Sequence, residues 1–112
     1  MAAPPFIFLY PNSMVGQMYQ RILKQIQEKV QARQYLMTFH AEEEMLKDGL
    51  RLDEVERTIL TGNIVERQKD RVTKGWKYRI QGKAKPGQQV EVIVKLHPLG
   101  KAVIITIYKM GG

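Results

Sequence analysis

The spacing of hydrophobic residues changes once along the chain, from a helical period to a strand period. In the first part, apolar side chains recur every three or four positions, at Val15, Met18, Ile22, Ile26 and Val30. This spacing places them on one face of a helix, and Ser13 is a residue type that commonly caps a helix N-terminus. The pattern therefore predicts a helix that begins after Ser13 and ends near Arg33.

Two shorter helices are predicted before the period changes. Thr38 can cap the first of them, which places His40 in its first turn. The next helix is predicted over residues 53–61, where Asp53 and Glu56 have the spacing of a capping box. Three helices are therefore expected in the first 61 residues.

From residue 64 onward the period changes to that of a β-strand, with alternating apolar and polar residues in most segments and a nearly continuous apolar run at residues 102–108. Four strands are predicted, at residues 64–67, 76–81, 90–96 and 102–108. The last three are joined by short turns, which favours antiparallel pairing. The order of elements indicates an α+β protein, with the helices on one face of a four-stranded, mainly antiparallel sheet. We expect one domain over residues 13–112, preceded by an extended, proline-containing arm over residues 1–12.

The alternation also assigns the strand residues to two faces of the sheet. The face expected to pack on the helices carries Trp76, Tyr78, Ile80, Val90, Val92, Val94, Val103, Ile105 and Ile107. The opposite face is expected to carry Lys77, Arg79, Gln81, Glu91, Ile93, Lys95, Ile104, Thr106 and Tyr108. This second face is basic and includes a phenol, a combination that suits phosphates and stacked bases.

The charge of the chain is concentrated in its second half. The formal net charge is +7, and residues 62–112 hold 11 Lys and Arg against 3 Asp and Glu. Residues 1–61 hold 7 Lys and Arg against 8 Asp and Glu. A basic half favours an anionic partner, with nucleic acid before a membrane surface, although charge can also serve solubility alone.

The composition argues against several kinds of catalytic site, metal site and membrane segment. The chain has no cysteine, which excludes disulfides and a cysteine nucleophile, and Ser13 is its only serine, which gives a serine triad little support. His40 and His97 are its only histidines, and we expect no metal and no cofactor. The apolar run Phe6–Tyr10 is far shorter than the roughly 20 residues of a membrane span. A cytoplasmic protein is expected.

Several motifs in the middle of the chain are similar to those of a known family. They are Tyr35-x-x-Thr38-x-His40-Ala41-x-x-x-Met45-x-x-Asp48-Gly49, Asp53-x-Val55-x-x-x-Ile59-x-x-Gly62-x-Ile64 and the closing run Val103-Ile104-Ile105-Thr106-Ile107-Tyr108. Over residues 34–109 the chain resembles the small bacterial domain-of-unknown-function family numbered four-two-five-eight. The resemblance implies a barnase/colicin/RelE-like fold and a ribonuclease toxin whose partner is an antitoxin protein. Glu91 departs from the family, because many members carry a histidine there.

A ribonuclease of this kind makes the RNA 2′-hydroxyl attack the neighbouring phosphate, without a metal ion. It needs a proton acceptor, a proton donor and a cation for the charge that builds on the phosphate. The candidates are His40 as base or acid, Arg79 and Lys95 as phosphate stabilisers, and Tyr108 as acid or stacking residue. The candidates for RNA binding are Lys77, Arg79, Lys95 and Thr106.

Other interpretations of the same residues stay open. His40 can instead tie its helix to the sheet, and Tyr108 can simply pack at a strand end. The chain can then be a non-catalytic module that binds RNA or protein through its basic sheet face. A third interpretation is an inactive paralogue that is held by an antitoxin. The sequence does not predict an oligomeric state.

Overall fold

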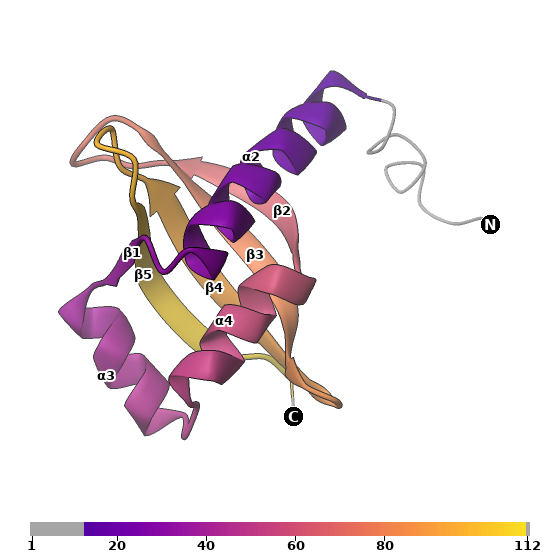
Figure 1. Ribbon diagram of the computed structural model, residues 1–112, viewed down its shortest axis with the longest axis vertical. Helices are drawn as coiled ribbons and strands as arrows, with labels where there is room; N and C mark the ends of the chain where they lie inside the picture. Colours follow the sequence, from indigo (N-terminus) through magenta and orange to yellow (C-terminus); the bar gives the residue numbers. More distant parts are fainter. Residues whose placement is uncertain (1–12, 112) are drawn as a thin grey trace.

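The structure is a computed structural model that describes residues 13–111, so the predicted arm over residues 1–12 lies outside the described part. Its elements are α2 (Met14–Gln31), β1 (Tyr35–Met37), α3 (Phe39–Lys47), α4 (Leu52–Thr61), β2 (Asn63–Lys69), β3 (Trp76–Lys85), β4 (Gln88–Leu96) and β5 (Ala102–Lys109). The strands form one sheet in the order β1-β5-β4-β3-β2 (Figure 1). The α+β class is therefore confirmed. None of the helices in residues 13–111 is long and apolar enough to cross a membrane.

The sheet has five strands rather than the predicted four, because the link after the first helix contains β1. This strand runs parallel to β5, with Tyr35 opposite Ala102 and Met37 opposite Ile104. The other three pairings are antiparallel, so the sheet is mixed. Three residues are too few to show an alternating pattern, and the partner strand lies at the other end of the chain. The sequence pattern therefore could not reveal this pairing.

Two of the predicted helix caps are confirmed by hydrogen bonds. The hydroxyl of Ser13 accepts from the Gly16 N–H at 2.9 Å, and the hydroxyl of Thr38 accepts from the Ala41 N–H at 3.1 Å. Each hydroxyl satisfies a backbone donor that has no partner within its helix. The Thr38 cap places His40 in the first turn of α3, as predicted.

The predicted cap of α4 is wrong. The helix begins at Leu52, and the carboxylate of Glu54 accepts from the Arg51 N–H at 2.9 Å. Glu56 has another role, because its carboxylate accepts a hydrogen bond from the hydroxyl of Tyr35 on β1. The capping motif therefore lies two residues before the predicted one.

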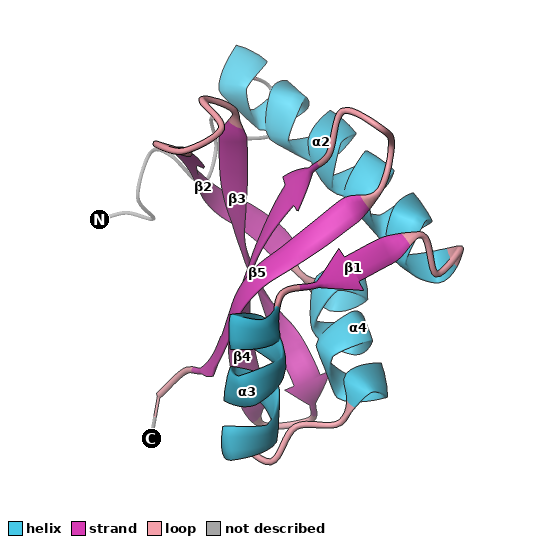
Figure 2. Ribbon diagram, turned by 90° about the vertical axis from the view of Figure 1, so that its left-hand side faces the viewer, coloured by secondary structure: helices cyan, strands magenta, loops and turns pink. Residues whose placement is uncertain are grey.

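The hydrophobic core lies between the sheet and two helices. Figures 1 and 2 show α2 and α4 across one face of the sheet, whereas α3 lies beside β1 and β5. The helices contribute Ile26 and Val30 from α2 and Val55 and Ile59 from α4. The sheet residues of the core are Ile64, Tyr78, Ile80, Ala84, Val90, Val92, Val94, Ala102, Ile104 and Ile107. The predicted packing of three helices on one face is confirmed for α2 and α4, whereas α3 lies at the side of the sheet formed by β1 and β5.

One part of the predicted face assignment is wrong, because β5 contains an irregularity. Val92 pairs with Ile107, but Val94 pairs with Ile104, so one extra residue of β5 lies between these two pairs. An extra residue reverses the alternation of side chains along the rest of a strand. Ile104 is consequently buried among the core residues and does not belong to the opposite face. Val103, which the alternation assigns to the core, instead lies opposite Lys95 and is only partly buried.

A second correction concerns Gly82, which the strand prediction placed at the end of its strand. In the structure β3 continues to Lys85, and the turn that follows contains Gly87 with a φ of 81°. A Cβ atom on Gly82 would lie 2.0 Å from the Thr58 carbonyl oxygen and 2.9 Å from the Gly62 Cα. Gly82 therefore allows the backbone of α4 to lie directly against β3.

Candidate functional site

The face of the sheet opposite α2 and α4 holds most of the predicted site residues. We call it the open face, since no helix of residues 13–111 lies across it (Figure 2). Its residues include Lys77, Arg79, Gln81, Glu91, Ile93, Lys95, Val103, Thr106 and Tyr108, as the pairings of β3, β4 and β5 place them. Thr106 lies opposite Ile93, one pair along from Tyr108 and Glu91.

Glu91 is the centre of a hydrogen-bonded cluster on the open face, although only 1% of the residue is exposed. Arg79 donates two parallel hydrogen bonds to its carboxylate, from Nε and Nη2, both at 2.9 Å. Gln81 donates a third at 2.9 Å, and the Tyr108 hydroxyl donates a fourth. Arg79 also pairs with Glu66 on β2. We call these five residues the Glu91 cluster.

The cluster fixes the protonation of its members. Burial alone would raise the pKa of Glu91, but the hydrogen bonds from Arg79, Tyr108 and Gln81 hold it at about 2. Hydrogen bonds to Glu91 and Glu66 raise the pKa of Arg79. Burial and the hydrogen bond to Glu91 raise the pKa of Tyr108. At neutral pH the cluster therefore contains an ionised Glu91, a charged Arg79 and a protonated Tyr108.

The guanidinium of Arg79 is a hydrogen-bond donor in a fixed position, and its positive charge is largely paired. Three of the five N–H groups of a guanidinium are used in its bonds to Glu91 and Glu66. The remaining two are the groups that it can offer to a phosphate. Because two carboxylates face one guanidinium, the positive charge of Arg79 is offset locally.

His40 lies near the cluster, across a hollow of about 300 Å³ that Tyr108 also lines. Its side chain is 65% exposed, and Nε2 lies 3.2 Å from Oε1 of Glu44, one turn later in α3. The same Glu44 oxygen accepts the Ile107 N–H at 3.1 Å, so Glu44 ties α3 to β5. The fold thus brings His40 and Tyr108 to one hollow. Within residues 13–111, no three His, Asp or Glu side chains gather where they could hold a metal ion.

Lys95 lies apart from this hollow, toward the other end of β4. It lies four positions after Glu91, which corresponds to roughly 13 Å along a strand. Its amino group lies 3.1 Å from Oδ2 of Asp70 and donates to the Thr73 hydroxyl at 2.7 Å. Lys77 lies directly opposite Lys95 in the sheet. The structure therefore separates Lys77 and Lys95 from His40 and Tyr108.

Sequence reasoning missed the role of the acidic residues in the basic half. That half has three carboxylates, and all of them pair with the two cations predicted to stabilise phosphate. Glu66 and Glu91 pair with Arg79, and Asp70 pairs with Lys95. A signal existed, because the strand alternation already placed Arg79 and Glu91 on one face. The departure from the family at Glu91 did not by itself indicate that the new carboxylate pairs with Arg79.

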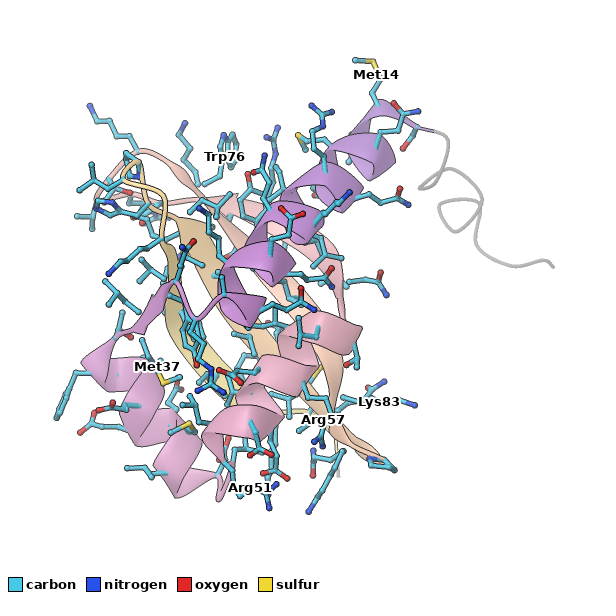
Figure 3. The ribbon with its side chains drawn as sticks, in the orientation of Figure 1. Met14, Met37, Arg51, Arg57, Trp76 and Lys83 are labelled. Carbon is cyan, nitrogen blue, oxygen red and sulfur yellow. The ribbon has the colours of Figure 1, made fainter. Side chains whose placement is uncertain are left out.

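Sequence reasoning also missed cations that lie at the two ends of the sheet. At one end, Arg67 lies 3.9 Å and Lys69 4.7 Å from the ring centre of Trp76. Trp76 was expected in the core but is 38% exposed, because it lies near the sheet's edge beside these cations. At the other end, Figure 3 shows Arg57 and Lys83 near each other. Both line a second hollow, described below.

Comparison with known proteins agrees with the resemblance in the sequence. The family model described as "Domain of unknown function (DUF4258)" matches residues 37–109. No curated protein and no solved structure matches the chain. The matched segment runs from the end of β1 to the end of β5, so it contains His40, α4 and the whole Glu91 cluster, whereas α2 precedes it. The chain therefore belongs to the DUF4258 family.

Proposed function

We propose that this chain is a ribonuclease that cleaves RNA without a metal ion, as the toxin of a toxin–antitoxin pair. The observation that supports this most is the position of Tyr108, which lines one hollow with His40 and donates a hydrogen bond to Glu91. The hydroxyl of Tyr108 therefore lies between the imidazole of His40 and the guanidinium of Arg79, which Glu91 holds in place. Cleavage through the RNA 2′-hydroxyl needs a proton-transfer group of this kind beside fixed donors for the phosphate.

In the proposed reaction, neutral His40 takes the proton of the 2′-hydroxyl as the 2′-oxygen attacks phosphorus. The bond to the 5′-oxygen breaks, which leaves a 2′,3′-cyclic phosphate and a 5′-hydroxyl. The two remaining N–H groups of Arg79 donate to the phosphate oxygens, where negative charge builds. Tyr108, which its raised pKa keeps protonated, turns its hydroxyl from Glu91 to the leaving 5′-oxygen and gives its proton to that oxygen. The positive charge of Arg79 lies beside the phenolate that results.

A second candidate function is a module that binds RNA without cutting it. It is favoured by the ion pairs of Arg79 and Lys95, which offset the two cations assigned to phosphate stabilisation. The other Lys and Arg residues of the basic half form no ion pair with residues 13–111. Unpaired cations attract phosphates and position a nucleic acid, but they transfer no proton at neutral pH. The two candidates therefore differ in whether bound RNA is cut.

The test is a cleavage assay on end-labelled single-stranded RNA in the presence of EDTA. We expect products that end in a 2′,3′-cyclic phosphate, and no cleavage of the same sequence made as DNA. His40→Gln should lower turnover by about 10²-fold or more, because glutamine cannot accept the proton. His97→Gln is the matched control, since His97 lies in the β4–β5 turn and does not line the hollow of His40 and Tyr108. This control should keep full activity.

Two results would overturn the nuclease. One is RNA that stays intact in the presence of the folded wild-type protein, and the other is cleavage that EDTA abolishes. Equal activity of His40→Gln and His97→Gln would remove His40 from the reaction. The toxin assignment has its own readout, because inducing the chain in a bacterial host should arrest growth and create new RNA 5′ ends. His40→Gln should do neither.

A further inference from the structure

A hollow with a volume of about 700 Å³ lies where α4 ends against β3. Its lining residues are Arg57, Thr61, Asn63, Val65, Gln81, Gly82, Lys83, Lys85, Pro86 and Gln89. Three of them are cations, three are amides, and none is Asp or Glu. We call this the α4–β3 hollow.

The cations of this hollow differ from those of the Glu91 cluster in having few partners. Within residues 13–111, no carboxylate lies within ion-pair distance of the amino groups of Lys83 or Lys85, and both side chains are exposed. Arg57 uses Nη1 to donate to the Ala84 carbonyl at 2.9 Å, which fixes the guanidinium beside β3. Its Nη2 lies 3.9 Å from Asp53, at the limit of an ion pair. The hollow therefore keeps most of its positive charge.

The shape of the hollow depends on the close contact of two backbones. Gly82 lines it, and a Cβ atom there would overlap the Thr58 carbonyl oxygen. A Cβ atom on Gly62 would likewise lie 2.6 Å from the Gln81 carbonyl oxygen. Thr61 fixes the same junction, because its hydroxyl accepts the Lys83 N–H at 3.1 Å. The cations are thus attached to a rigid part of the fold.

Gln81 connects the α4–β3 hollow to the candidate site. Its side chain donates to Glu91 at 2.9 Å, and the same residue lines the hollow. Along β3, residues two apart are separated by roughly 7 Å, so Arg79, Gln81 and Lys83 follow one another in a row. A strand of RNA that occupies the hollow can therefore reach Arg79 without crossing the core.

We propose that the α4–β3 hollow holds backbone phosphates of single-stranded RNA and so positions the strand at the Glu91 cluster. This subsite rests on the proposed function, since it serves the same RNA. Lys83 and Lys85 neutralise phosphates, Arg57 donates from a fixed position, and the amides of Asn63 and Gln89 donate to phosphate or sugar oxygens. Such contacts position a nucleic acid and carry no sequence preference.

The experiment measures binding of a labelled 2′-O-methyl RNA, which cannot be cut through its 2′ position, across a salt series. The variant carries Lys83→Ala with Lys85→Ala. The matched control carries Arg21→Ala with Lys24→Ala, which removes the same charge from exposed positions on α2. For single strands, the slope of log affinity against log salt changes by about 0.7 for each phosphate contact, so the variant should lose about 1.4. The control should keep the wild-type slope.

Cleavage kinetics give a second readout. On natural RNA, the Lys83 and Lys85 variant should raise KM and leave kcat unchanged, because the hollow binds the strand away from the reacting atoms. A wild-type slope in this variant, or no binding of RNA by the wild-type chain, overturns the subsite. RNA that is bound with the expected loss of slope but is never cut overturns the nuclease and supports the subsite. The two proposals can therefore fail separately.

Discussion

Two positions on one strand, Arg79 and Lys83 of β3, use their positive charge in opposite ways. Arg79 is placed between Glu66 on β2 and Glu91 on β4, and its charge is offset by both. Lys83 lies opposite Gln89, an amide, and keeps its charge. The strand is equally basic at both places, so the cross-strand neighbours decide which cation is free. A count of charges along a strand therefore does not locate a phosphate site, whereas the register of the neighbouring strands does.

The largest effect should come from the glycine beneath the α4–β3 hollow. Gly82→Ala places a methyl group 2.0 Å from the Thr58 carbonyl oxygen, so α4 must move away from β3. We expect a loss of about 3 kcal/mol or more in the free energy of unfolding, measured by urea denaturation. Gly75→Ala is the control, because its new methyl group meets only the Thr73 hydroxyl, at 3.8 Å. If both variants unfold alike, the close contact does not build the hollow.

The next effect should come from the centre of the Glu91 cluster. Glu91→Gln removes the buried anion and leaves Arg79 paired with Glu66 alone, so we expect a loss of about 2–3 kcal/mol in the free energy of unfolding. Glu28→Gln on α2 is the control, because Glu28 forms no ion pair with the described residues and its side chain is exposed. A loss no greater than that of the control would mean that Glu91 does not hold the cluster together.

The stability that Glu91 contributes to the folded chain should fall in acid. The pKa of Glu91 is about 2 in the folded chain, below the value of about 4.3 expected when it is unfolded. Its stabilisation is therefore complete above about pH 4.3 and is lost as the pH falls toward 2. The difference in unfolding free energy between wild type and Glu91→Gln should shrink over this window. A difference that stays constant between pH 5 and about 2 would contradict the low pKa.

The smallest effect on stability should come from Lys83 and Lys85 of the α4–β3 hollow. Replacing Lys83 and Lys85 with Ala should change the unfolding free energy by about 0.5 kcal/mol or less, because both side chains are exposed and neither forms an ion pair with a residue in the range 13–111. Measured beside Glu91→Gln, this variant sharpens the contrast between cations that hold the fold and cations that are available to a ligand. A loss comparable to that of Glu91→Gln would show that these lysines have structural partners.

Most local patterns in the sequence predicted the local structure, although the capping box expected at Asp53 was wrong. The helical stripe, the caps at Ser13 and Thr38 and the alternation along β3 and β4 all depend on residues close together in the chain. The parallel pairing of β1 and the extra residue in β5 depend on strands that are distant in sequence. A hydrophobic pattern carries no information on such pairing, so Ile104 was assigned to the wrong face.

The candidate site was predictable to a similar extent. Sequence alone placed His40 in the first turn of its helix, and the alternation placed Arg79, Glu91 and Tyr108 on one face. It could not predict the shared hollow of His40 and Tyr108, because α3 reaches β5 through contacts across the chain. It also gave no sign of the α4–β3 hollow, which depends on Gly62 and Gly82 lying against each other.

The pairing of β1 with β5 also determines when the domain can be completed during its synthesis. During synthesis β1 leaves the ribosome well before its partner β5 does. Two hydrogen bonds of Thr38 also depend on β5. Its backbone N–H donates to the Ile104 carbonyl, and its hydroxyl donates to the Ile105 carbonyl. Contacts between such distant segments form slowly, because a long loop must close first. A nascent chain therefore carries an unpaired β1 and an undocked α3 until β5 has left the ribosome.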